Sequence, residues 1–329
     1  MKTYRQLADL PAATRPVVAT IGNFDGVHLG HQGVIAEVLS RARFLGGQSL
    51  AITFNPHPAR ILRPEQPQPL ITPLARKLEL LAATGIDATL VLPFTDELRR
   101  MHPRDFAADI LVNAVHVTEV HEGENFNFGY RPPNRPATEN SITGLESLGH
   151  ELGFAVVVYA PRIVRGAPVS SSRIRTLLAA GDVSHARALL GRPFSVDSTP
   201  APGRGYGTKY AVPTINLAPY PELLPAHGVY ITTLAIGQEV FESVTNVGNR
   251  PTFGSDSFAV ESHLLNFHPI DLAEDTPLRL TFLRRLRAER PFPTTRHLRD
   301  QIARDVTQAR RYFTLCHRVR RPAVGGAGA

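Results

Sequence analysis

Apolar and polar positions follow two different patterns in the first half of the chain. Buried strands are predicted by short apolar runs at residues 17–21, 49–54, 88–94, 114–121 and 154–159. Helices are predicted where apolar residues recur at three- and four-residue spacing, after residue 33, over 73–84 and near 104–113. Strands that alternate with helices predict an α/β domain, built on a Rossmann-like parallel sheet with helices on both faces.

The second half has a different pattern. Residues 169–191 predict two short helices, with Gly181 ending the first and Asp182 capping the second. Beyond residue 192 helical spacing largely disappears, and strand-like runs separated by Gly and Pro cover residues 215–217, 229–236, 240–247, 259–267 and 278–283. Regularly spaced short strands predict a β-barrel or a sandwich.

Helical spacing returns over residues 294–313, where one stripe holds Leu298, Ile302, Val306 and Ala309. A chain of 329 residues is too long for one comfortable core, so two domains are expected. We place them at residues 1–186 and 187–321, and we expect the small-residue tail, 322–329, to be disordered.

Sequence composition bears on the cellular location of the protein. No apolar run approaches the roughly 18 residues of a membrane span, and the polar N-terminus lacks the apolar core of a signal peptide. Cys316 is the single cysteine, so no disulfide can form within the chain. These features predict a cytoplasmic protein without a membrane partner.

The formal net charge of +7 raises the question of nucleic acid. Residues 279–321, however, contain thirteen Arg and only three acidic residues. The excess positive charge is therefore local, and the rest of the chain is slightly acidic. No nucleic-acid-binding motif accompanies the arginines. A solvated basic helix face is therefore the preferred reading, and nucleic-acid binding is a distant alternative.

The most informative stretch, residues 20–33 (TIGNFDGVHLGHQG), joins the first strand to the first helix. Gly22, Gly26 and Gly30 allow close backbone approach or positive φ, and His28 and His31 are spaced to share one helix face. A helix N-terminus attracts anions, so a phosphate chain is the expected ligand. Zinc is an alternative for paired histidines, but no third ligand lies at a convincing spacing.

Three further polar stretches are candidates for the same crevice. TFNPHP (residues 53–58) and GENFNFG (123–129) each follow a strand, and SSSRIR (170–175) begins a helix. Taken singly, they have ordinary readings: a rigid turn, aromatic packing, and a capped helix with two surface arginines. The serine hydroxyls and guanidinium groups of SSSRIR can also clamp phosphate.

Together and in this order, GNFDGVHLGHQ, TFNPHP, GENFNFG and SSSRIR resemble the motifs of the bacterial bifunctional riboflavin kinase/FMN adenylyltransferases, the FAD synthetases. The resemblance implies an HxGH nucleotidyltransferase domain in which FMN attacks ATP, giving FAD and pyrophosphate. His28 and His31 would then be catalytic. Nucleotide or flavin would be bound by Gly22, Phe24, Asp25, Gly26, Phe54, His57, Asn125, Ser171, Ser172, Arg173 and Arg175.

In the second half, PTINL, NVGNRPTFG and VESHLLNF resemble the riboflavin kinase module, an antiparallel β-barrel with a C-terminal helix. The resemblance implies that ATP phosphorylates riboflavin to FMN. Thr214 and Asn216 would hold Mg²⁺ and phosphate, and Glu261 would accept the proton of the ribityl hydroxyl. Without those motifs, Glu261 reads as the solvent-facing residue of a strand.

One departure leaves alternatives open. Thr208 and Ala211 of GTKYAVPTIN stand where the family has Arg and Gly, so the chain could be a monofunctional adenylyltransferase with a degenerate flavin-binding barrel. A flavin- or nucleotide-sensing protein without turnover is a second alternative, against which His28, His31 and Glu261 count. The expected partners are the small-molecule substrates ATP, riboflavin and FMN, with the protein a monomer or weak homo-oligomer.

Overall fold

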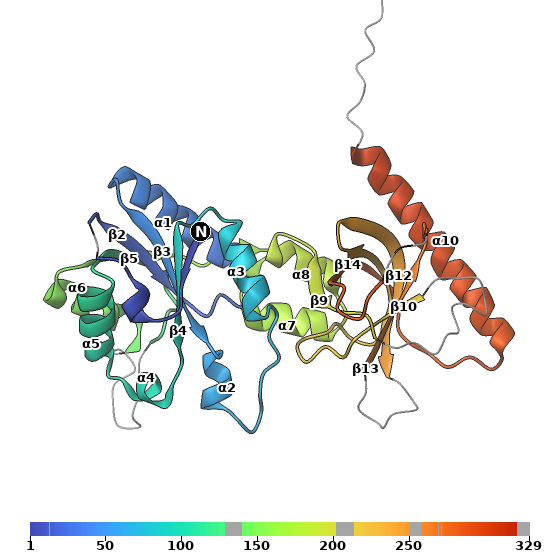
Figure 1. The fold of residues 1–329 in the computed structure, drawn as a ribbon, viewed down its shortest axis with the longest axis horizontal. Helices are drawn as coiled ribbons and strands as arrows, with labels where there is room; N and C mark the ends of the chain where they lie inside the picture. The colour runs from blue at the N-terminus through green and yellow to red at the C-terminus, as the bar shows by residue number, and fades with distance from the viewer. Residues whose placement is uncertain are drawn as a thin grey trace, which may run out of the picture. The chain divides into compact units, whose positions relative to one another are not determined.

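The computed structural model describes residues 1–12, 14–128, 140–201, 214–249, 258–268, 270 and 272–320. The chain divides into two compact units, Met1–Arg173 and Ile174–Ala329, which are described separately (Figure 1). The predicted tail lies outside the described residues, as do residues 202–213, which hold most of the departing loop. No helix in the described ranges is long and apolar enough to cross a membrane.

The N-terminal unit alternates strands and helices. Its elements are β1 (Lys2–Tyr4), η1 (Leu7–Asp9), β2 (Val17–Ile21), α1 (Leu29–Phe44), β3 (Gln48–Asn55), α2 (Pro58–Leu62), α3 (Leu74–Ala82), β4 (Ala88–Pro93), α4 (Asp96–Arg100), α5 (Pro103–Asp105), η2 (Phe106–Ala114), β5 (Val117–Gly123), α6 (Ile142–Leu152), β6 (Ala155–Tyr159), β7 (Ile163–Val164) and β8 (Ala167–Pro168). Helix α7 (Ser171–Ala179) crosses into the second unit.

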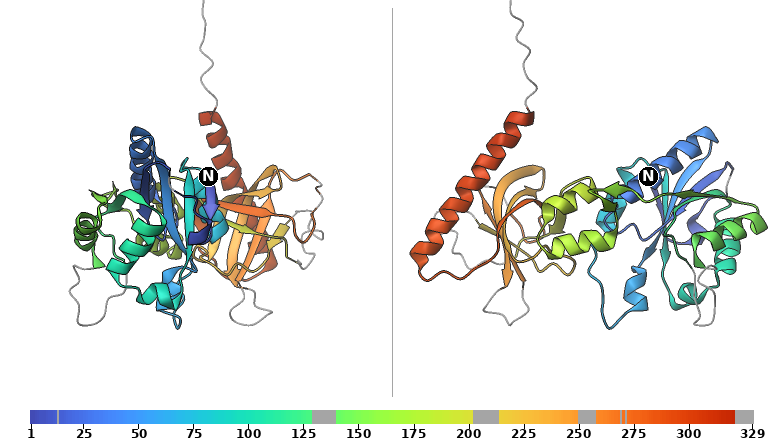
Figure 2. Two further views of the ribbon diagram at one scale, coloured as in Figure 1. Left: turned by 60° about the vertical axis from the view of Figure 1, so that its left-hand side comes forward. Right: turned by 180° about the vertical axis from the view of Figure 1, so that it is seen from behind.

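Six of these strands form one parallel sheet in the order β1-β4-β3-β2-β5-β6. Helices cover both faces, as Figures 1 and 2 show. Val17, Ala19 and Ile21 pack with η2 and α6, whereas Val18 packs with α1. The chain leaves β2 toward β3 on one side and reaches β5 on the other, so the carboxyl ends of β2 and β5 form the switch point where ligands bind in such sheets.

The predicted parallel sheet is confirmed, with local differences. The helix expected near residues 104–113 consists of the short α5 followed by η2, a π-helix in which the Val115 amide donates to the Ile110 carbonyl. It extends to Ala114, and His116 then adopts a positive φ of 54°. As a result β5 begins at Val117, three residues later than the apolar run indicated.

The C-terminal unit is an antiparallel sheet with helices. Its elements are α8 (Val183–Leu190), β9 (Phe194–Ser198), β10 (Thr214–Leu217), β11 (Gly228–Ile236), β12 (Glu239–Asn249), β13 (Phe258–Leu264), β14 (Leu278–Arg287) and α10 (Thr295–Arg320). The strand order is β10-β13-β12-β11-β14-β9. The two predicted short helices are present as α7 and α8, with Gly181 at φ 78° and Asp182 accepting from the His185 amide.

Backbone hydrogen bonds close this sheet. Directly after edge strand β9, Pro200 forms a bridge to Leu217 of the opposite edge strand, β10. The Ala201 amide donates to the Asn216 carbonyl at 2.9 Å, and the Ala218 amide donates to the Thr199 carbonyl at 2.8 Å. The two edges therefore pair with each other, which gives the predicted β-barrel.

Helix α10 lies along the barrel (Figure 2) but does not bury the predicted stripe. Val306 and Ala309 pack against the sheet, whereas Leu298 and Ile302 are 39% and 45% exposed. The prediction was wrong in the first half of the helix because Arg287 and Arg290 reach it there. Asp305, 3% exposed, pairs with Arg287, and Gln301 accepts a hydrogen bond from Arg290.

Candidate functional site

The glycine-rich loop after β2 is wound tightly. Gly26 has a φ of 86°, and two non-glycine residues, Phe24 and Val27, also have positive φ, at 45° and 37°. Both are nearly fully buried in a cluster with Ile35 of α1. Strained backbone of this kind persists when the surroundings fix it, and it is concentrated at functional sites.

The loop brings His28 and His31 together at the start of α1. Their rings stack with centroids 3.7 Å apart and an interplanar angle of 13°. His28 caps the helix, because its Nδ1 accepts from the His31 amide at 3.3 Å, so the proton of a neutral His28 ring is on Nε2. Gly30 makes the arrangement possible, since a Cβ there would lie 3.1 Å from the His28 ring.

The second histidine is held neutral. Burial, with the neighbouring His28 and Lys77, keeps the pKa of His31 well below its ordinary value. The His31 Nδ1 is buried and has no hydrogen-bond partner in the described part of the chain. A buried polar atom without a partner is costly, so this atom is suited to meet a ligand.

Asp25 braces the loop. Its buried carboxylate accepts from the backbone amides of Ile71 and Thr72 and from the Thr72 hydroxyl, at 2.9 to 3.2 Å. The Thr72 hydroxyl in turn accepts from the Gly26 amide at 2.9 Å. The side chain of Asp25 thus joins the glycine loop to the segment before α3, and its predicted contact with nucleotide or flavin is not tested.

Ser171 of SSSRIR contacts the same loop. The Ser171 hydroxyl donates to the Asp25 carbonyl at 2.8 Å, while Ser172 is exposed. Nη1 of Arg173 donates to the carbonyls of Val164, Ala167 and Pro168, so this nitrogen holds the β7–β8 hairpin. Arg175 lies in the second unit, and its place relative to the loop is not determined.

The two remaining N-terminal motifs follow β3 and β5. His57 caps α2 through Nδ1, which accepts from the Ala59 amide at 3.1 Å, and Phe54 packs edge-on against Phe94. Asn125 is exposed, whereas Phe126 and Phe128 stack on each other and pack against the core. The ordinary readings of rigid turn and aromatic packing therefore hold for part of each motif, and ligand contacts of Phe54, His57 and Asn125 stay predictions.

Sequence reasoning missed Lys77 and Glu122 at this edge of the sheet. Lys77, on α3, is 3% exposed, and burial lowers its pKa to about 8. Glu122, at the end of β5, accepts from the Ile21 amide and the Thr20 hydroxyl, and burial raises its pKa well above the ordinary value. The available signal was position: Lys77 falls on the apolar stripe of α3 with Leu74 and Leu81, and Glu122 directly follows the strand-like run of residues 114–121.

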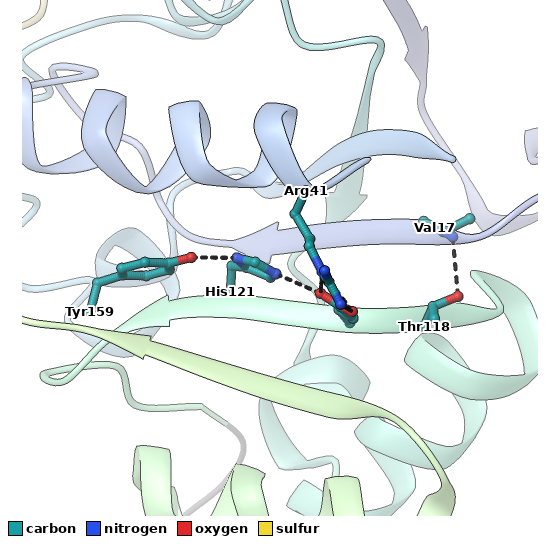
Figure 3. Close-up of polar contacts among 6 residues, drawn as sticks. Val17, Arg41, Thr118, His121 and Tyr159 are labelled. Carbon is teal, nitrogen blue, oxygen red and sulfur yellow. Dashed lines mark hydrogen bonds and ion pairs between the residues drawn. The ribbon is translucent and has the colours of Figure 1, made fainter. Parts of the chain in front are cut away.

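A polar network anchors the far end of α1 (Figure 3). Nε and Nη2 of Arg41 donate to the carboxylate of Glu119 on β5 at 2.7 to 3.0 Å. Glu119 also pairs with His121 at 3.1 Å, and His121 contacts the Tyr159 hydroxyl at 2.8 Å. Arg41 lowers the pKa of Glu119, which keeps the pair ionised. The network thus fixes the helix that carries His28 and His31.

The candidate residues of the C-terminal unit also lie together. Asn216 of β10 is directly opposite Glu261 of β13, and Thr214 is opposite His263. Residues opposite each other on neighbouring strands have Cβ atoms about 5 Å apart. Thr214 and Glu261 are exposed and Asn216 is half-buried, so all three are accessible on one stretch of the sheet. Residues 250–254 of NVGNRPTFG lie outside the described ranges.

Comparison with known families supports the division into two domains. The sequence matches the family model described as FAD synthetase over residues 10–173 and the one described as riboflavin kinase over residues 190–313. The first match spans the glycine loop and extends to Arg173, and the second spans Thr214, Asn216 and Glu261. These matches confirm the resemblance that the sequence motifs indicated.

Whole-length relatives agree. A bifunctional riboflavin kinase/FMN adenylyltransferase from Pseudomonas fluorescens is 35% identical over 311 residues, covering 94% of this chain and 97% of that protein. One from Escherichia coli K12 is 30% identical, covering 96% and 99%. The crystal structure of a macrolide-efflux protein from Streptococcus pneumoniae superposes with a TM-score of 0.83 at 24% identity, covering 94% and 98%, and shows the fold alone.

Proposed function

The chain belongs to the family of bifunctional riboflavin kinase/FMN adenylyltransferases, and from that premise we propose how its residues carry out two successive reactions. In the C-terminal unit, riboflavin takes the γ-phosphoryl group of ATP, giving FMN and ADP. In the N-terminal unit, a phosphate oxygen of FMN attacks the α-phosphorus of a second ATP, giving FAD and pyrophosphate.

The adenylylation site is the glycine loop with the start of α1. A phosphate nucleophile is already anionic and needs no strong base, so the protein has to position two anions and stabilise the transition state. The observation that carries this assignment is the stacked pair His28 and His31, with a buried Nδ1 on His31 that lacks a partner among the described residues. Ring N–H groups at a helix N-terminus are suited to donate to phosphate oxygens.

The kinase site is the Thr214, Asn216 and Glu261 stretch of the barrel. A hydroxyl nucleophile gains from a carboxylate that accepts its proton, and Glu261 is the carboxylate next to Asn216 across the strand pair. The oxygen atoms of Thr214 and Asn216 are ligands of the kind that Mg²⁺ prefers. These residues would hold the ion with ATP, where it neutralises phosphate charge.

The remaining assignments are predictions from the sequence that the proposal retains. The boundary at 186/187 lies between the two family matches, which end at residue 173 and begin at 190. A cytoplasmic location, a monomeric or weakly oligomeric state and the lack of a nucleic-acid partner complete them.

The test is a time course. Purified chain is incubated with ATP, Mg²⁺ and riboflavin, and the flavins are separated; FMN should form first and FAD should follow. A parallel reaction that starts from FMN isolates the adenylylation. FAD from FMN with no FMN from riboflavin would support the monofunctional alternative, and flavin binding without either product would support the sensing protein.

A further inference from the structure

Lys77 is a buried cation with little compensation for its charge. Its Nζ donates to the Thr53 hydroxyl at 3.4 Å, which is a long hydrogen bond, and no carboxylate of the described residues forms an ion pair with it. Asp25 attracts it, but the Asp25 carboxylate already accepts from Ile71 and Thr72. Burying an ammonium group with so little compensation destabilises a fold, and a bound anion would offset that cost.

The position of Lys77 points to such an anion. Thr53, at the end of β3, also donates to the Asn23 carbonyl of the glycine loop at 3.4 Å, so Nζ lies beside this loop. His31 lies beside the same loop, because its ring packs edge-on against Phe24 with centroids 5.2 Å apart. The charge of Lys77 also contributes to the lowered pKa of His31. The ammonium group of Lys77 has one long hydrogen bond, and the buried Nδ1 of His31 has no partner in the described residues. Both lie beside the same loop, so one bound anion would satisfy both.

We infer that Lys77 is a phosphate-binding residue of the adenylylation site, where its ammonium group binds a phosphate oxygen of ATP beside His31. The inference rests on the proposed function of the N-terminal unit. It adds a residue that lies outside all four sequence motifs. Negative charge grows on the departing pyrophosphate as the α-phosphorus is transferred, and a fixed cation at its side stabilises that change.

The protonation state of Lys77 provides a readout that a supporting role would not give. Its pKa of about 8 is set by burial, with Asp25 opposing the shift, so the free chain loses this charge as the pH rises through about 8. The other titratable groups that face it are Asp25 and His31. His31 is neutral in that range, because its pKa is well below 6.5.

The experiment uses the full chain with Lys77→Met and, as control, Arg43→Met, which removes one exposed positive charge from α1. Adenylylation of FMN is measured from pH 6.5 to 9.5. Lys77→Met should lower kcat/KM for ATP roughly 10- to 100-fold, the value of a hydrogen bond to a charged partner. The wild type should lose activity above about pH 8, and the variant should lack this limb. Its unfolding midpoint without ligand should not fall, because an uncompensated buried charge is removed.

Adenylylation of FMN by Arg43→Met should be unchanged. Riboflavin phosphorylation should be unchanged in all variants. An unchanged kcat/KM, or a loss that comes with a lower unfolding midpoint and the wild-type pH profile, would overturn the inference. If the wild type makes no FAD from FMN, the proposed function fails by itself. Calorimetric titration with inorganic pyrophosphate then decides on Lys77: weaker binding by Lys77→Met supports the phosphate site, and equal affinity removes it.

Discussion

At the scale of single residues, the proposed adenylylation site combines two histidines at a helix start with side chains from distant segments. His28 and His31 were predictable because a three-residue spacing at a helix start has one spatial outcome. Lys77 and Glu122 were missed despite their positions in the pattern, since a lone charged residue in an amphipathic segment usually faces solvent. Arg173 was expected to clamp phosphate, yet one guanidinium nitrogen holds a hairpin through three carbonyls. Which partner a side chain chooses depends on distant segments.

Gly30 gives a sharp test of the histidine stack. Gly30→Ala should disturb His28, because the added Cβ would lie 3.1 to 3.2 Å from its ring, and should lower adenylylation of FMN about tenfold or more. Helix α1 should not be weakened, since Ala is the better helix former by about 1 kcal/mol. Gly33→Ala is the matched control, because no atom lies within 4 Å of its added Cβ. Equal rates for both variants in a steady-state assay would show that the stack is not needed.

Glu122 predicts a pH effect on stability. Its folded-state pKa is raised well above 4.5, so the stability it contributes is complete below about 4.5 and is lost as the pH rises through the folded-state pKa. Glu122→Gln keeps an oxygen that can accept from the Ile21 amide and does not titrate. The variant's unfolding midpoint should therefore gain on the wild type as pH rises from 4.5, as followed by calorimetry. Glu124→Gln, at an exposed position, is the control, and a pH-independent difference for Glu122→Gln would contradict the buried-carboxyl assignment.

At the scale of elements, apolar runs predicted the central strands of both sheets with small errors at their ends, but not the edge strands β1 and β9 or the short β7 and β8. In helix α10, however, the apolar spacing does not identify the buried face. Its apolar residues Leu298 and Ile302 face solvent, while Gln301 and Asp305 face the barrel. Hydrophobic spacing identifies the buried face only where the surface beneath is apolar, and here that surface presents Arg287 and Arg290.

Removing one partner of the Arg287–Asp305 ion pair should lower the unfolding free energy more than removing both partners. Asp305→Ala leaves the partly buried Arg287 without its carboxylate and should cost about 3–5 kcal/mol of unfolding free energy. Adding Arg287→Met should restore much of that loss. A double-mutant cycle by denaturant unfolding measures the coupling, with Asp300→Ala as the exposed control. Additive losses would mean that the pair does not fix α10.

At the scale of the whole molecule, two units with different architectures were predictable because the change from alternating helices and strands to regular short strands is visible in the sequence. Closure of the barrel was not, since Pro200 and Leu217 pair at its edges through backbone atoms alone. The altered loop before Thr214 lies largely outside the described residues, so its effect on the kinase site stays a prediction from the sequence. We assign each reaction to one unit.

The most direct test of this claim compares His31→Ala with Glu261→Gln in the same time course from riboflavin and from FMN. We predict that His31→Ala accumulates FMN, with adenylylation lowered roughly 100-fold or more by loss of a transition-state donor. Glu261→Gln should phosphorylate riboflavin about 10²–10⁴-fold more slowly, yet convert supplied FMN to FAD at the wild-type rate. If both reactions fall together in either folded variant, the assignment of two separate sites is contradicted.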